Sequence, residues 1–221
     1  MSVAEVSELP AALSRKTRRV YDALSALYPL STMLFHSEAH RQALALSGIQ
    51  DGMRILEVAT GSGEMFQRLV CANRSGRTVG VDLSPKMAAR TQRTARLNYP
   101  GSRADCQAVD ARAMPFQDGA FDAVVCCYLL ELLPSEDIES TVAEFRRVLR
   151  RNGRLTLILI GQHAPFFNSM YQVCTRVAPA FWGRQVEERL PAMIQAHQFE
   201  ILRDEKVQQI FYPSRVLIAR K

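Results

Sequence analysis

The amino-acid sequence predicts an α/β fold built on one seven-stranded, mostly parallel sheet with helices on both faces and an antiparallel last strand. Apolar, β-rich runs alternate with helical patterns from residue 54 to residue 161, and the last two β-rich runs are joined by a short connection. Alternating strands and helices form a parallel sheet covered on both faces, whereas a short connection produces a hairpin. The chain has 221 residues, of which 48% are hydrophobic, so we expect one globular domain.

The expected elements follow one another in a regular order. β-rich runs predict seven strands, at residues 54–59, 77–83, 104–111, 121–130, 154–161, 199–207 and 209–221. Helical patterns between them predict helices at residues 63–73, 85–98 and 137–153. Pro85 suits the first turn of its helix, and Gly153 is expected to stop the last one. One or two further helices are expected within residues 11–47, ahead of the first strand.

Composition and charge narrow the functional classes. The net charge of +6 suggests an acidic partner, either an anionic membrane surface or nucleic acid. No apolar run reaches the ~18–20 residues that span a bilayer, and the first residues lack the order of a secretory signal, so we expect a cytoplasmic protein. The five cysteines include no C-x-x-C pair, which argues against a disulfide framework and a structural zinc site, and no metal is expected.

A glycine-containing turn follows the first strand. The sequence Glu57-Val58-Ala59-Thr60-Gly61-Ser62-Gly63 places an acidic residue at the end of an apolar run and two glycines in the turn after it. Glycine lets the backbone approach a ligand closely, because it has no Cβ atom. In open α/β sheets ligands bind beyond the carboxyl ends of the strands, so this turn is a candidate binding loop.

An aspartate ends the second strand, nineteen residues after Gly63. A carboxylate in this place can accept hydrogen bonds from both hydroxyls of a ribose, although Asp82 could instead cap the helix that begins near Ser84. A nicotinamide or flavin site is disfavoured, since the place of the third glycine is taken by Phe66. A phosphate-binding P-loop is excluded, because no Lys-Ser or Lys-Thr pair follows the glycines.

Two later strands end in further candidates. Asp110 and Ala111 end the third strand, where the carboxylate could accept a hydrogen bond from an adenine amino group or could simply close a turn. The stretch Cys127-Tyr128-Leu129-Leu130-Glu131 ends the fourth strand, at the place where the reacting end of a ligand is expected.

These stretches together resemble the class I S-adenosylmethionine-dependent methyltransferases, in the group that includes quinone-biosynthesis and phospholipid N-methyltransferases. The matching stretches lie between residues 54 and 160 and read ILEVATGSG, VGVDLSPKM, DARAMPFQDGAFDAVVCCYLLELLP and EFRRVLRRNGRLTLI. The resemblance implies a Rossmann-like fold, S-adenosyl-L-methionine as cofactor and S-adenosyl-L-homocysteine as product. It also implies that the chain is an enzyme that transfers a methyl group.

The resemblance further implies roles for individual positions. Glu57 faces the methionine amino group through the loop, and Asp82 holds the ribose. The loop that passes close to the cofactor contains Ala59, Gly61 and Gly63. Leu83 and Met87 pack near the adenine, and Asp110 and Ala111 contact its edge. Cys127 lies beside the methionine moiety. A methionine at helical spacing, such as Met87, is also typical of a core position.

We expect residues 1–221 to form a single methyltransferase domain with four parts. Residues 1–50 are expected to form a helical lid and residues 51–161 the cofactor-binding core. Residues 162–198 are expected to form a helical insertion on the side of the acceptor, and residues 199–221 a final pair of strands.

No catalytic residue follows from the motifs. A base is needed only if the acceptor must lose a proton, and the candidates are His163, after the fifth strand, with His36 and Tyr28 in the N-terminal segment. His36 and His40 are four residues apart and share a helix face that could border the pocket. A structural or surface role is the alternative for each of them.

The acceptor is expected to be a small molecule or a lipid. The stretches FFNSMY, LLELLP and FYPS resemble phospholipid N-methyltransferases, which makes phosphatidylethanolamine the first expectation. The apolar residues between 166 and 182 fit either a tunnel for a lipid or a lid helix packed on the core. The basic residues at 15–19 fit either peripheral contact with an anionic membrane or a lid whose charges face solvent.

Three alternatives to a phospholipid stay open. A quinone ring is one, although the fourth-strand region departs from the Arg-Asn sequence common in that branch. A natural product and a non-catalytic cofactor-binding protein are the others. Nucleic acid is not expected, because the Asn/Asp-Pro-Pro-aromatic motif for base amino groups is missing.

Overall fold

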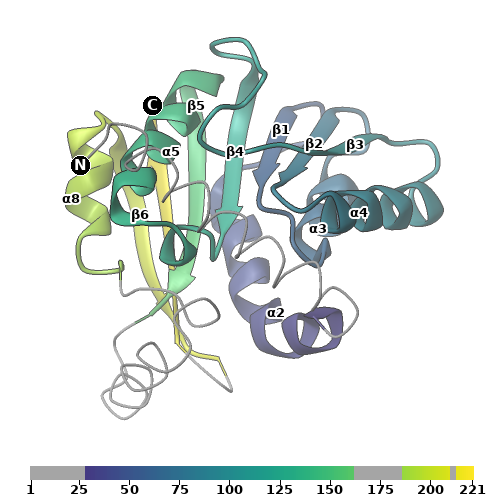
Figure 1. Cartoon of the computed structure of the whole chain (residues 1–221), viewed down its shortest axis with the longest axis horizontal. Helices are drawn as coiled ribbons and strands as arrows, with labels where there is room; N and C mark the ends of the chain where they lie inside the picture. The colour runs from purple at the N-terminus through teal and green to yellow at the C-terminus, as the bar shows by residue number, and fades with distance from the viewer. Residues whose placement is uncertain (1–27, 162–185, 210–212) are drawn as a thin grey trace, which may run out of the picture.

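The computed structural model describes residues 28–161, 186–209 and 213–221, with side chains from residue 37 onward (Figure 1). The basic residues at 15–19, His163 and the apolar stripe within 166–182 lie outside these ranges. The side chains of Tyr28 and His36 also lie outside them, so their proposed roles as bases stay predictions.

The described strands form one sheet in the order β3-β2-β1-β4-β5-β7-β6. Strands β1 to β5 run parallel to their neighbours, and β7 pairs antiparallel with both β5 and β6. The expected mostly parallel seven-stranded sheet with an antiparallel last strand is therefore confirmed. The strands are β1 Arg54–Val58, β2 Arg77–Asp82, β3 Arg103–Ala108, β4 Phe121–Cys127, β5 Leu149–Ile160, β6 Glu200–Val207 and β7 Ser214–Arg220.

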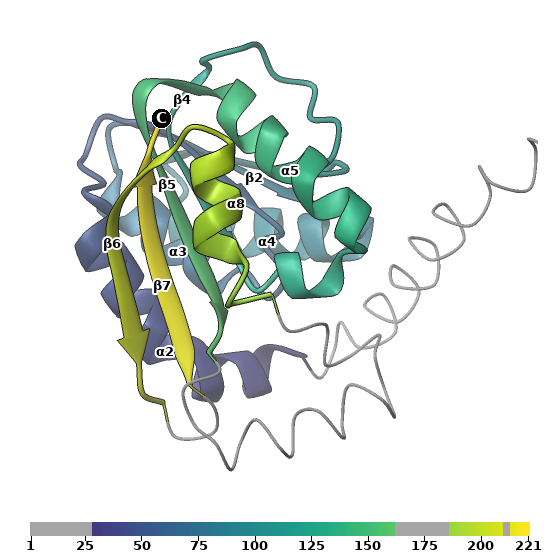
Figure 2. The same ribbon diagram turned by 90° about the vertical axis from the view of Figure 1, so that its left-hand side faces the viewer.

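Helices cover both faces of the sheet (Figures 1 and 2). Helices α2 and α3 pack on one face and α4 packs beside α3, whereas α5 and α8 pack on the opposite face. Their bounds are α2 Tyr28–Ser47, α3 Glu64–Ala72, α4 Pro85–Asn98, α5 Ser135–Val148 and α8 Leu190–Ala196, with a 3-10 turn η1 at Leu130–Leu132. The start of α4 agrees with the expected one because Pro85 occupies the first turn and the Ser84 hydroxyl accepts the Met87 N–H at 3.3 Å.

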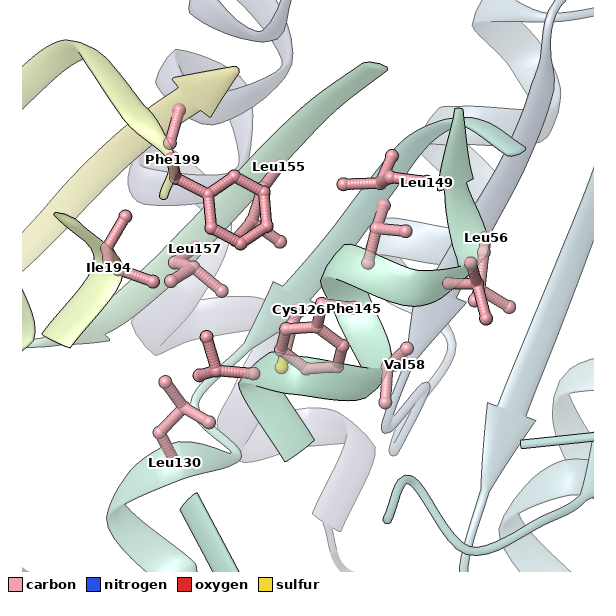
Figure 3. Close-up of a cluster of buried hydrophobic side chains, with 14 of the residues drawn as sticks. Leu56, Val58, Cys126, Leu130, Phe145, Leu149, Leu155, Leu157, Ile194 and Phe199 are labelled. Atoms are coloured by element: carbon pink, nitrogen blue, oxygen red, sulfur yellow. The ribbon is translucent and has the colours of Figure 1, made fainter. Parts of the chain in front are cut away.

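The largest part of the core lies between the sheet and the layer of α5 and α8 (Figure 3). Alternate residues of the central strands point to this side, and side chains of both helices pack against them. The labelled members are Leu56, Val58, Cys126, Leu130, Phe145, Leu149, Leu155, Leu157, Ile194 and Phe199. The residues between them along each strand face α2 and α3, so the sheet is buried on both faces, as parallel sheets usually are.

The expected helix at 137–153 is wrong at its end. Helix α5 stops at Val148, and Leu149 begins β5 by pairing with Phe121. The register of this pairing shifts before Ala123, so the start of β5 is irregular and Gly153 lies within the strand rather than after a helix. A Cβ atom at Gly153 would lie 2.8 Å from the Arg150 carbonyl oxygen, which is the physical reason for glycine there.

Candidate functional site

The candidate site lies where the strand order reverses. The chain runs from β1 outward through β2 to β3 and then returns to β4 on the other side of β1. Ligands of open α/β sheets bind in the crevice beyond the carboxyl ends of the two strands at such a switch point. The residues that follow these two strands, Ala59 and Tyr128, both have left-handed backbones, with φ of 63° and 55°. Strain of this kind in a residue other than glycine is concentrated at functional sites.

The loop after β1 is held across the end of β2. The N–H groups of Ala59 and Thr60 both donate to the Val81 carbonyl oxygen, at 2.8 and 3.2 Å. Gly61 and Gly63 have positive φ values of 50° and 81°, so the turn itself requires residues that accept this conformation. A Cβ atom at Gly63 would lie 2.8 Å from the Thr91 hydroxyl oxygen, so this loop packs tightly on α4.

Asp82 ties this loop to β2. Its Oδ2 atom accepts the Gly61 N–H at 2.8 Å, and its Oδ1 atom accepts the Ser84 N–H at 2.9 Å. Asp82 therefore has a structural role at the start of α4, although the side chain that caps the helix is the Ser84 hydroxyl. Each carboxylate oxygen can accept a second hydrogen bond, so the same group can also bind ribose hydroxyls, and the ribose role stays a prediction. Beside it, Leu83 is 37% exposed, whereas Met87 is fully buried.

Glu57 is a buried acid at the end of β1. Its side chain is 1% exposed, and Oε2 has no hydrogen-bond partner among the described residues. Burial raises the pKa of Glu57 well above its ordinary value, and the negative charges of Asp82 and Glu64 raise it further. A buried carboxylate with an unpaired oxygen and two acidic neighbours suits a cationic group. The residues present therefore fit a cofactor that carries an ammonium group at this place.

Asp110 is held by an arginine. Arg112 donates to both carboxylate oxygens, at 2.6 to 3.2 Å, and also donates to Asp137 of α5 at 2.8 Å. These hydrogen bonds from Arg112 lower the pKa of Asp110. The ion pair connects the end of β3 to the opposite helix layer, while Ala111 is half-buried against the core. The expected hydrogen bond from an adenine amino group to the Asp110 carboxylate stays a prediction.

The motifs assign no contacts to a polar chain on the α2 side of the site, although the sequence places His40 on a helix face that could border the pocket and Tyr128 near the reacting end of the ligand. His40 of α2 is buried, and its Nδ1 atom lies 3.5 Å from a carboxylate oxygen of Glu64 at the start of α3. The ring of Tyr128 lies 6.2 Å from the His40 ring, and its hydroxyl lies 2.8 Å from the Ser214 hydroxyl of β7. Gln209 donates to the same Ser214 oxygen at 2.7 Å. These contacts fix the left-handed Tyr128 between α2 and β7.

Glu131 is the second residue that the motifs did not assign. It lies in η1, directly after β4, and its Oε1 atom accepts the Ile160 N–H of β5 at 2.7 Å. The side chain is 3% exposed, and within the described part of the chain Oε2 has no hydrogen-bond partner. A single acid within the apolar stretch LLELLP was the available signal, because an acid is seldom fully buried without a reason.

Two further findings concern the described part of the chain only. Within it, no group of three or more His, Cys, Asp or Glu side chains has an arrangement that could hold a metal ion. Its helices are all too short or too polar to cross a bilayer.

Comparison with known proteins places this geometry among methyltransferases. Residues 55–153 match the family described as "Methyltransferase domain". The chain is 28% identical over 179 residues to the ubiquinone/menaquinone biosynthesis C-methyltransferase of Hahella chejuensis, covering 77% of this chain and 70% of that protein. It is 33% identical over 138 residues to the demethylmenaquinone methyltransferase of Thermus thermophilus, covering 62% of this chain and 60% of that protein.

A solved structure shares the fold over nearly the whole chain. This is the 1,6-didemethyltoxoflavin-N1-methyltransferase of Burkholderia thailandensis, with bound 1,6-didemethyltoxoflavin and S-adenosylhomocysteine. Its TM-score is 0.72 at 17% identity, covering 96% of this chain and 90% of that one.

Proposed function

Because this chain belongs to the class I S-adenosylmethionine-dependent methyltransferase family, we propose that it methylates a ring carbon of a reduced quinone. The observation that carries the choice of acceptor is the similarity to two enzymes of quinone methylation. A phospholipid acceptor, the first expectation from the sequence, has no counterpart among these relatives. The matched region spans 70% and 60% of the two relatives, so their activities support this proposal and do not replace its test.

The cofactor is S-adenosylmethionine, and we assign its contacts to the switch point. Glu57 would hold the cationic amino group, since its buried oxygen has no other partner. Asp82 would hold the ribose and the loop of Ala59, Gly61 and Gly63 the methionine backbone. When bound, the cofactor supplies an electrophilic methyl group, and its sulfur keeps the electron pair of the broken bond.

Contacts to the base and to the reacting end complete the assignment. The exposed face of Leu83 would cover the adenine, with Met87 packed beneath it. Asp110 and Ala111 would lie at the adenine edge and Cys127 beside the methionine moiety. Three features at the carboxyl ends of the strands therefore support cofactor binding. They are the buried acid Glu57, the exposed apolar side chain of Leu83 and the strained loop that begins at Ala59.

The chain's own contribution to methyl transfer is orientation and exclusion of water. Correct orientation of two reactants can contribute up to about 7–11 kcal/mol to a barrier. Residues that end β4 are suited to this task, because Cys127 packs between the α2 and α3 clusters and Tyr128 is fixed by Ser214. They would form an ordered floor for the acceptor at the carboxyl end of β4.

Two measurements on the full chain test the proposal. Calorimetric titration with S-adenosylhomocysteine measures cofactor binding. Transfer of an isotope-labelled methyl group is then measured to a prenylated 1,4-naphthohydroquinone with a free ring carbon and, in parallel, to phosphatidylethanolamine vesicles. We expect S-adenosylhomocysteine to bind, and we expect the label to appear in the naphthohydroquinone and not in the phospholipid. Label in the phospholipid alone would contradict the quinone assignment, binding without transfer to either would support the non-catalytic alternative, and no binding would contradict the cofactor assignment.

A further inference from the structure

Glu131 occupies a position between the carboxyl ends of β4 and β5. Its Oε1 atom accepts a hydrogen bond from the Ile160 N–H, whereas the buried Oε2 atom has no partner in the ranges 37–161, 186–209 and 213–221. A buried polar atom without a hydrogen bond costs about 1–3 kcal/mol, and the link to β5 uses only the other carboxylate oxygen. The unpaired oxygen therefore requires another explanation.

The charged and titratable surroundings of Glu131 come from several elements. Burial raises the pKa values of Cys126, Cys127 and Tyr128, and the negative charge of Glu131 raises them further. On the α8 side, Glu187 adds a second negative charge. The guanidinium of Arg215 lies 3.6 Å from the Glu187 carboxylate and so compensates Glu187 rather than Glu131.

The balance of these effects leaves Glu131 able to exchange a proton near neutral pH. Burial raises its pKa to about 7, and the hydrogen bond from the Ile160 N–H opposes this increase only in part. A group of this kind can take a proton from an acidic hydroxyl and return it to water at the same pH.

We infer that Oε2 of Glu131 accepts the proton of a ring hydroxyl of the methyl acceptor, an inference that rests on the proposed quinone methylation. The group lies in η1 at the end of β4, next to the floor formed by Cys127 and Tyr128, where the acceptor must lie to meet the methyl group. Its role is that of a general base held in place by Ile160.

The proton and electron balance of this step is simple. The hydroxyl proton moves to Oε2, and the electron pair left on oxygen makes the neighbouring ring carbon nucleophilic. This carbon would then bond to the methyl group, while the bond between the methyl group and the cofactor sulfur breaks and its electron pair stays on the sulfur. The ring then regains its aromatic form as the hydrogen on that carbon leaves as a proton and the ring oxygen takes one up. Glu131 finally releases its proton to water, and no oxidant or metal is consumed.

The variant Glu131→Gln tests the inference without removing the link to β5, because the amide oxygen can still accept the Ile160 N–H. We expect kcat for the naphthohydroquinone to fall by about 100-fold or more, with KM and the affinity for S-adenosylhomocysteine nearly unchanged. Wild-type kcat should rise with pH through the range around 7, and the variant should lose this dependence. Glu136→Gln, on the exposed side of α5, is the matched control and should behave as wild type.

A spectroscopic measurement reports on the same group without turnover. Infrared difference spectra of the wild-type protein should contain a protonated carboxyl band that titrates near pH 7 and is absent from Glu131→Gln. A folded Gln variant with wild-type kcat and pH dependence would overturn the inference alone, as would a Glu131 band that titrates near its ordinary carboxyl pKa. A wild-type protein that does not methylate the hydroquinone would overturn the proposed function and this inference with it.

Discussion

Ala59 and Tyr128 have left-handed backbones at the ends of two neighbouring strands, β1 and β4. Both follow directly on the last paired residues, and both turn the chain away from the sheet at the switch point. Neither is glycine, so each position stores conformational energy that the surrounding contacts must offset. The hydrogen bonds of Ala59 to β2 and of Tyr128 to Ile158 and Ser214 are those contacts.

The strain at Ala59 predicts the effect of a single substitution. Ala59→Gly should increase the free energy of unfolding by up to about 1 kcal/mol, because relief of a left-handed backbone, about 1–2 kcal/mol, exceeds the entropy of about 0.5–1 kcal/mol that glycine adds to the unfolded chain. Ala108→Gly, at the end of β3, should decrease it by about 0.5–1 kcal/mol, since glycine there only adds entropy to the unfolded chain. Urea unfolding measures both, and a decrease for Ala59→Gly would contradict the strain.

Gly80 of β2 packs closely against Thr60 of the binding loop. A Cβ atom there would lie 2.7 Å from Thr60 Cγ2, 2.9 Å from the Phe66 ring and 3.0 Å from the Cys106 sulfur. Gly80→Ala should therefore lower the free energy of unfolding by about 1–3 kcal/mol through overpacking. Gly101→Ala is the matched control, because nothing lies within 4 Å of its added methyl group. Equal stability of the two variants in urea unfolding would show that the loop adjusts freely.

The ribose assignment of Asp82 predicts a loss of cofactor affinity. Asp82→Asn keeps an acceptor oxygen for one of the two backbone N–H groups but removes the charge and one acceptor. The affinity for S-adenosylhomocysteine should fall by about tenfold or more, which corresponds to about 1.4 kcal/mol. Asp105→Asn, on exposed β3, should leave the calorimetric affinity unchanged. An unchanged affinity for the Asp82 variant would remove the ribose role.

Glu57 predicts that cofactor binding releases a proton. In the free protein the raised pKa keeps this buried carboxyl protonated up to a higher pH than usual. A cationic amino group beside it would favour the carboxylate and lower that pKa, so at a pH between the two values binding expels a proton. Calorimetry of S-adenosylhomocysteine binding in buffers of different ionisation enthalpy measures the release, which Glu57→Gln should abolish. Proton uptake by the wild type would contradict the assignment.

The fold could be predicted from the sequence where local signals agree with the packing. Helix α4 agrees with its expected range because Ser84 and Pro85 fix its start and the chain leaves the helical pattern after Asn98. The end of α5 could not be predicted, since helical spacing continues past Val148 and only the pairing of Leu149 with Phe121 stops the helix.

The candidate site was predictable only in part for a similar reason. The residues that follow β1 to β4 have local motifs, whereas the burial of Glu131 and the fixing of Tyr128 depend on strands far along the chain. Ile160 binds Glu131 from β5, and Ser214 binds Tyr128 from β7. Contacts of this range leave no periodic trace in the sequence.

The position of β7 has a consequence for protein synthesis. Although β7 comes last of the seven strands along the chain, it lies between β5 and β6 within the sheet. While the protein is still on the ribosome, β6 emerges before β7, its partner among the described strands, and the edge of β5 stays open until β7 has left the exit tunnel. The nascent chain therefore exposes an unpaired strand edge from the emergence of β5 until that of β7, and this is the stage at which a chaperone would protect it from aggregation.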